Sequence, residues 1–88
     1  MPGLSLVDGV SWRAVNGKAI ILHGPSSRYY TLNETATVIF RQALRGRSPA
    51  AIARAVSKSY GVSLAAAEAD ARRLQGSLVR EGLARERA

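Results

Sequence analysis

Side chains that could carry out catalysis are few in this sequence, and they are scattered. The single histidine, His23, ends an apolar stretch, and no motif places a proton-transfer partner or an orienting group beside it. The chain has no cysteine, so thiolate nucleophiles and thiolate metal sites are excluded. The acidic residues show only the spacing of helix surfaces, and the glycines do not form a phosphate-binding loop. The sequence therefore predicts a protein that is not an enzyme and that has no cofactor and no metal site.

The size and charge of the chain limit its partners. Its 88 residues allow one domain, residues 1–88, with one modest core. The formal net charge of +7 favours acidic partners, although solvated helix faces explain the scattered basic residues equally well. Residues 1–10 do not resemble a targeting signal, and the longest dense apolar run, 19–22, is too short to span a bilayer. We therefore predict a cytoplasmic protein without membrane contact.

The first half of the chain has the features of three short β-strands, which must position any site. Asn16-Gly17 is a strong signal for a tight hairpin turn, because both residues accept a positive φ angle. A second turn is expected at 24–27, where glycine, proline and serine interrupt the apolar pattern. The strands then cover 11–15, 18–23 and 28–32.

The turn lengths predict the register of this sheet. A two-residue turn pairs Trp12 with Ile21, and a four-residue turn pairs Ile21 with Tyr30. Because side chains alternate across a sheet, we expect the apolar face to pack on the core; it collects Trp12, Ala14, Ala19, Ile21, Tyr30 and Leu32. The opposite face is mixed and partly exposed, and collects Arg13, Ile20, Leu22, Tyr29 and Thr31.

The second half predicts three helices. Capping residues precede three apolar repeats of helical spacing, and glycines follow them. The starts are Asn33, or alternatively Thr31 with Glu34 as a capping box, then Ser48 before Pro49, then Ser63; the stops are Gly46, Gly61 and Gly82. The predicted fold is α+β, a three-stranded antiparallel sheet followed by three helices that cover its apolar face. Residues 1–9 and 84–88 are expected to be loosely ordered, with Leu83 folding back on the last helix.

An ordered series of motifs resembles the PqqD-like family. Trp12 and the apolar strand 20–22 precede the stretch SRYYTLNETA at 27–36, which is similar to that family's signature between its third strand and first helix. Further matches follow in the same order at 46–49, 52–53, 60–62 and 78–83. The resemblance covers nearly the whole chain, although no single motif is as specific as a metal-site spacing.

This resemblance implies a winged helix-turn-helix-like fold and a function as a RiPP recognition element. Such domains bind the leader of a ribosomally synthesised, post-translationally modified peptide as an added strand, and present the precursor to modifying enzymes. The amino-acid sequence of residues 26–36 is closer to that of the lasso-peptide type, which acts beside a leader peptidase and a macrocyclase. The alternative is the pyrroloquinoline quinone type, which acts as a peptide chaperone beside a radical-SAM enzyme.

The predicted peptide site lies between the third strand and the third helix. The second strand is central in the predicted register, so 28–32 is a sheet edge that can accept another strand. The helix stripe that includes Asp70 and Arg73 is the expected opposite wall, and Arg73 could pair with a leader carboxylate. The expected leader-binding residues are Arg28, Tyr29, Tyr30, Thr31, Leu32, Ala67, Asp70, Arg73, Leu74, Ser77 and Leu78.

Two other functions are compatible with the pattern. Residues 52–74 resemble a helix-turn-helix, but the third helix would offer DNA apolar methyls and two acids, so we expect no nucleic-acid partner. A scaffold that bridges other proteins without binding a leader also remains possible. An open sheet edge is compatible with either a monomer or a weak dimer.

Overall fold

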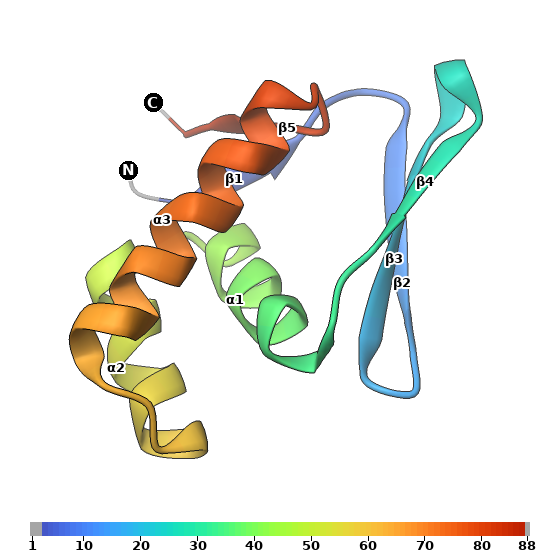
Figure 1. Ribbon diagram of the computed structural model, residues 1–88. Helices are drawn as coiled ribbons and strands as arrows, with labels where there is room; N and C mark the ends of the chain where they lie inside the picture. The colour runs from blue at the N-terminus through green and yellow to red at the C-terminus, as the bar shows by residue number, and fades with distance from the viewer. Residues whose placement is uncertain (1–2, 88) are drawn as a thin grey trace.

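The computed structural model of the protein describes residues 3–87 and contains two small antiparallel sheets and three helices (Figure 1). The elements in chain order are β1 Leu4–Leu6, β2 Val10–Val15, β3 Lys18–His23, a 3-10 turn Gly24–Ser26, β4 Arg28–Thr31, α1 Glu34–Leu44, α2 Pro49–Tyr60, α3 Leu64–Arg80 and β5 Ala84–Glu86. The predicted α+β class and the order of three strands and three helices are confirmed. The additional strands β1 and β5 lie at the two ends of this series.

The three-stranded sheet has the order β2-β3-β4 and the predicted register. Trp12 pairs with Ile21, and Ile21 pairs with Tyr30. The hairpin between β2 and β3 turns at Asn16 and Gly17, whose φ angles of 53° and 78° are those that a tight primed turn requires. Ala19 and Ile21 are fully buried, so the apolar face of this sheet is the core face as predicted.

His23 stabilises the turn between β3 and β4. Its Nδ1 atom accepts the backbone N–H of Ser26 at 3.2 Å and lies 2.7 Å from the Ser26 hydroxyl. Ser27 then adopts a left-handed conformation with φ of 59° and leads into β4. The single histidine is therefore engaged in the local structure of a turn.

Each helix starts at a side-chain cap. The Asn33 carboxamide oxygen accepts the N–H of Ala36 at 2.8 Å, so Asn33 is the cap of α1 and the alternative capping box is wrong. Ser48 and Ser63 cap α2 and α3 in the same way, as predicted. Gly61 ends α2 with a φ of 70°, which a glycine adopts without strain.

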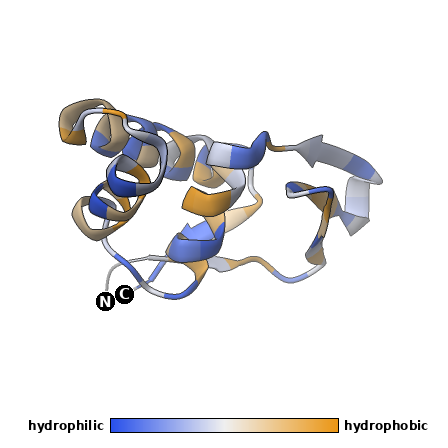
Figure 2. Ribbon diagram, turned by 90° about the horizontal axis from the view of Figure 1, so that it is seen from below, coloured by the Kyte–Doolittle hydropathy of each residue, from blue (hydrophilic) through white to orange (hydrophobic). Residues whose placement is uncertain are grey.

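The core lies between the inner face of the three-stranded sheet and the helices. The helices gather on one side of this sheet, and hydrophobic segments alternate with hydrophilic ones along them (Figure 2). Phe40 of α1 is fully buried and meets Trp12 of β2 edge-on, with ring centroids 5.2 Å apart. Ile52 and Val56 of α2 belong to the same buried cluster as Ala67, Ala71 and Leu78 of α3, and α2 packs on α3 and α1.

The two ends of the chain differ from the expectation of loose order. β1 pairs with β5, and Leu4 opposes Glu86 in the register. Leu4 and Leu83 are almost completely buried, and the Arg87 side chain donates to the carbonyl of Leu4 at 3.1 Å and also to that of Leu44. Three-residue strands are too short to show alternation, so the sequence pattern could not reveal this sheet. Residues 1, 2 and 88 lie outside the described part.

Thr37 joins the sheet to α1 and gives a prediction. Its hydroxyl, which is buried, accepts the N–H of Ala19 at 2.8 Å and donates to the carbonyl of Asn33 at 2.8 Å. Thr37→Val keeps the shape but leaves the Ala19 N–H unpaired, so we expect a loss of about 1–3 kcal/mol in the free energy of unfolding, measured in urea. Thr37→Ser, which keeps the hydroxyl, should lose less; equal losses would contradict the assigned role of the hydroxyl.

Candidate functional site

β4 is an edge strand of the three-stranded sheet and pairs only with β3 within residues 3–87. The N–H of Leu32 donates to the carbonyl of Ala19 at 2.9 Å, so Leu32 directs its backbone groups towards β3. In an antiparallel ladder this direction alternates along the strand, so Tyr29 and Thr31 direct theirs to the free edge. These two residues are exposed. A second extended chain could therefore pair with β4 at this edge.

A hollow lies where β4 leads into α1, against the middle of α3. Its volume is about 240 Å³, and its lining residues are Asn33, Thr35, Ala36, Ile39, Asp70 and Arg73. Arg73 donates to Asp70 at 2.8 Å, and both side chains are at least half exposed. An exposed pair of this kind contributes less than about 1 kcal/mol, so its groups remain available to a ligand.

At the opposite end of β4, an ion pair approaches the end of α3. Arg28 lies 3.7 Å from Glu81, which is the C-cap of α3. Arg28 also donates to the Tyr30 hydroxyl at 2.6 Å, and its guanidinium lies 5.8 Å from the centre of the Tyr30 ring. The Tyr30 hydroxyl, and to a smaller extent Glu81, raises the pKa of Arg28.

The hollow and the ion pair lie at the two ends of the region between β4 and α3, and this region is called here the β4–α3 groove. β4 and α3 run in opposite directions, because the start of β4 meets Glu81 whereas its end leads to Asp70 and Arg73. The five steps from Arg28 to Asn33 span about 16 Å at the rise of a strand. The eleven steps from Asp70 to Glu81 span about 16 Å at the rise of a helix. The two walls therefore match in length.

The sequence itself also matches a known family. The family model of coenzyme PQQ synthesis protein D (PqqD) matches residues 18–84, which is most of the chain. The chain belongs to the PqqD family. The resemblance that the sequence motifs indicated is thereby confirmed. The comparison with curated proteins finds no match.

Two solved structures are similar to this PqqD-family chain. Lasso peptide synthetase B1 complexed with the leader peptide shares 33% sequence identity, covers 93% of this chain and 96% of its own, and gives a TM-score of 0.86. TbiB1 in complex with the TbiA(beta) leader peptide shares 23% identity, with coverages of 96% and 98% and a TM-score of 0.82. The second match, at its lower identity, supports the fold.

The predicted site residues of this PqqD-family chain divide into three groups by exposure. The exposed group consists of Arg28, Tyr29, Thr31, Asp70 and Arg73. Tyr29 and Thr31 reach the free edge of β4 through their backbone groups, whereas their side chains lie on the other face of the sheet from α3. The half-buried group consists of Tyr30, Leu32, Leu74 and Ser77. Ala67 and Leu78 have exposed fractions of 0% and 4%, so they belong to the core and offer no surface to a peptide. Their inclusion among the contact residues is therefore corrected.

Part of the groove was not anticipated from the sequence. The first turns of α1 form the floor of the hollow through Thr35, Ala36 and Ile39, and Glu81 marks the far end of the groove. These residues follow the capping motif and the last helix, where the sequence pattern indicates only local structure. A long-range signal, such as coupled variation between α1 and α3, would have been needed to find them.

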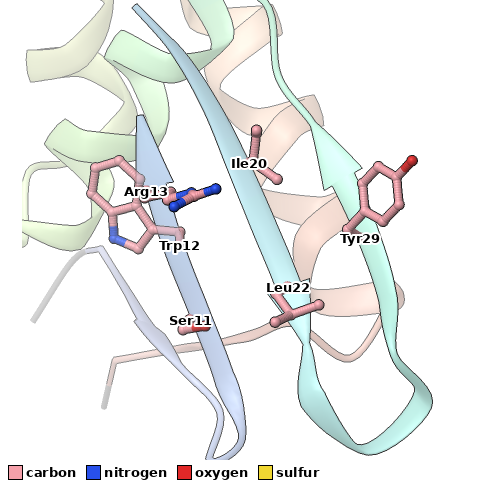
Figure 3. Close-up of a pocket in the computed structure, with 6 residues that line it drawn as sticks. All are labelled: Ser11, Trp12, Arg13, Ile20, Leu22 and Tyr29. Carbon is pink, nitrogen blue, oxygen red and sulfur yellow. The ribbon is translucent and has the colours of Figure 1, made fainter. Parts of the chain in front are cut away.

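A second hollow lies on the outer face of the three-stranded sheet. Its volume is about 400 Å³, and its lining residues are Ser11, Trp12, Arg13, Ile20, Leu22 and Tyr29 (Figure 3). The sequence predicts that this face is mixed and partly exposed. Leu22 and Tyr29 have exposed fractions of 44% and 70%, which agrees with that expectation.

Across residues 3–87, His, Asp and Glu side chains do not gather in groups of three that could bind a metal ion. None of the helices in this range is long and apolar enough to cross a membrane.

Proposed function

We propose that this protein is a non-catalytic recognition element, located in the cytoplasm, for the leader segment of a ribosomally synthesised precursor peptide. The leader binds as an added strand at the free edge of β4, with α3 as the opposite wall of the β4–α3 groove. The main support is the similarity, over nearly the whole length of both chains, to a lasso peptide synthetase B1 solved with its leader peptide. The free edge of β4 supplies the physical basis.

The dimensions of the groove indicate how much of the leader is recognised. A groove of about 16 Å accommodates about five residues of an extended chain. The backbone groups of Tyr29 and Thr31 pair with the backbone of the leader and give affinity without sequence selectivity. Selectivity comes from side chains of the leader that point to α3, where Asp70, Arg73 and Ser77 offer polar contacts. In this proposal Arg73 gives up its exposed hydrogen bond to Asp70 and donates instead to a carboxylate of the leader.

The pathway that we propose is lasso-peptide biosynthesis, with a leader peptidase and a macrocyclase as the enzymes that receive the precursor. The 33% identity to a lasso peptide synthetase B1 favours this pathway. The family model carries the name of a coenzyme PQQ synthesis protein, and a peptide chaperone for a radical-SAM enzyme is therefore the alternative.

DNA binding is disfavoured by the surface of α3. A recognition helix presents polar or basic groups near its N-terminus to base edges. Here Leu64, which starts α3, has an exposed fraction of 55%, and Ala65 and Ala66 follow it on the surface. Arg72, about two turns after Leu64, already pairs with Glu68 at 2.6 Å.

Direct binding measurements test the proposed function. We expect a fluorescently labelled leader, taken from a precursor gene beside this one, to bind the full-length protein in a polarisation titration with micromolar or tighter affinity. A scrambled leader of the same composition is the matched control and should bind at least tenfold more weakly. Random duplex DNA should bind weakly, and its affinity should fall steeply with salt because the contacts are made to phosphates. Specific binding of a duplex at physiological salt, with no leader bound, would contradict the proposal.

A further inference from the structure

The outer face of the three-stranded sheet is an exposed apolar surface that the leader site does not use. Alternation along the observed register assigns to this face Ser11, Arg13, Val15, Lys18, Ile20, Leu22, Tyr29 and Thr31. Leu22 and Tyr29 lie on neighbouring strands and oppose each other, and their exposed fractions are 44% and 70%. Figure 3 shows Ile20 and Leu22 of β3 between Arg13 of β2 and Tyr29 of β4. The side chains of this surface, called here the outer face, point away from the helices.

The composition of the outer face is that of a protein-binding surface. Ile20, Leu22 and Tyr29 form an apolar centre beside a hollow of about 400 Å³. Arg13, Ser11 and other polar groups surround this centre. Protein interfaces combine an apolar centre with a polar rim, and they are enriched in Tyr and Arg. A sheet face and an edge strand that are exposed to solvent and bind no partner would more commonly carry charged side chains at these positions.

The charge of the outer face determines the kind of partner. Arg13 and Lys18 are its charged residues, and none of the residues that the register places on it is acidic. A second copy of this chain would bring the same positive groups together, with a net charge of +7 on each copy. An acidic protein surface complements the outer face, whereas a second copy does not.

The position of the outer face connects it to the leader site. Tyr29 and Thr31 lie on β4, and their side chains point to the outer face while their backbone groups point to the free edge. A leader strand added to β4 would extend the sheet, and alternate side chains of the leader would continue the outer face. A protein seated there would therefore contact the bound leader and this protein at the same time.

We propose that the outer face is the docking surface for the modifying enzyme that receives the leader-bound precursor, and that this enzyme contacts it through an acidic surface with an apolar centre. This inference rests on the proposed function, because it requires the leader to occupy the edge of β4. It adds a second binding site, which lies on the opposite face of the sheet from the helices.

A peptidase assay separates docking from leader binding. The probes are the labelled leader and the leader peptidase encoded beside this gene, with the full-length protein at varied concentration. Leu22→Thr removes one of the three apolar side chains of the centre but keeps a residue that suits a strand, and Arg13→Glu reverses the charge at that position. Leu64→Thr, at a leucine of similar exposure on α3, is the matched control.

We expect both outer-face variants to bind the leader within twofold of the unmodified protein. The concentration of the protein–leader complex that gives half the maximal cleavage rate should rise at least tenfold for both variants, and Leu64→Thr should leave it unchanged. Raised salt should weaken docking of the unmodified protein more than docking of Arg13→Glu.

Several results would overturn the inference. If both variants keep the unmodified half-maximal concentration while the leader binds normally, the docking proposal fails and the proposed function stands. If sedimentation shows a dimer that Leu22→Thr dissociates, a second copy occupies the face instead. If the unmodified protein binds no leader at all, the proposed function itself fails, and the polarisation titration reveals this before any peptidase is added.

Discussion

Replacement of Phe40 by Ala should lower the free energy of unfolding by about 3–5 kcal/mol. Phe40 is fully buried, and its ring meets the Trp12 ring at an interplanar angle of 83°, which joins α1 to β2. The cavity left by the ring cannot close without moving the sheet relative to the helix. Since a domain of this size is stabilised by only about 5–15 kcal/mol, the variant should be unfolded to a large extent at moderate urea.

The loss in the free energy of unfolding is measured by urea titration, followed by far-UV circular dichroism and by the fluorescence of Trp12. Trp12 is the single tryptophan of the chain, so its fluorescence reports directly on the contact with Phe40. Tyr60→Ala removes an aromatic ring with an exposed fraction of 45% and should cost less than about 1 kcal/mol. Similar losses for Phe40→Ala and Tyr60→Ala would show that the assigned core is wrong.

The features that the sequence predicted correctly are those encoded by a few adjacent residues. Asn16-Gly17 specifies the hairpin turn, and the length of that turn determines which residues of β2 and β3 oppose each other. The caps Ser48 and Ser63 could also be predicted, because the hydroxyl of a serine before an apolar helical repeat accepts a backbone N–H of the first turn. The free edge of β4 followed from this register without any long-range information.

The features that were not predicted depend on contacts between distant segments. The β1–β5 sheet joins Leu4 to residues more than seventy positions away in the chain, and the individual strands are only three residues long. Helical spacing alone defines the stripes of α3 without naming the neighbour of each, so the stripe that faces β4 could not be assigned from the sequence. The same reason explains why the contribution of α1 to the groove was missed.

The core and the groove are linked through α1. Thr37 binds the sheet at Ala19, and Phe40 packs under Trp12, so the helix is anchored to the strands on its inner side. The first turns of the same helix form the floor of the groove beside Asp70 and Arg73. The distance between β4 and α3 is therefore set by core packing, and core variants that still fold are expected to weaken leader binding as well as stability.

Thr31→Pro should weaken leader binding about tenfold while lowering the stability of the free protein only slightly. The N–H of Thr31 is assigned to the free edge by the alternation that starts from the Leu32 bond to Ala19, so proline removes no bond between β3 and β4. It does remove the donor that the leader backbone uses, and it leaves a leader carbonyl unpaired. That loss is worth about 1–2 kcal/mol, and 1.4 kcal/mol corresponds to tenfold in affinity.

Two matched variants make this test specific to the backbone of β4. Thr31→Ala removes the side chain but keeps the N–H, so its leader affinity should stay within about threefold of the unmodified protein. Tyr30→Pro removes an N–H that points to β3, so it should lower the urea midpoint strongly, which Thr31→Pro should not. Leader affinity is measured by polarisation and stability by urea unfolding. If Thr31→Ala weakens binding as much as Thr31→Pro, the side chain and not the free backbone edge recognises the leader, and strand addition at β4 is excluded.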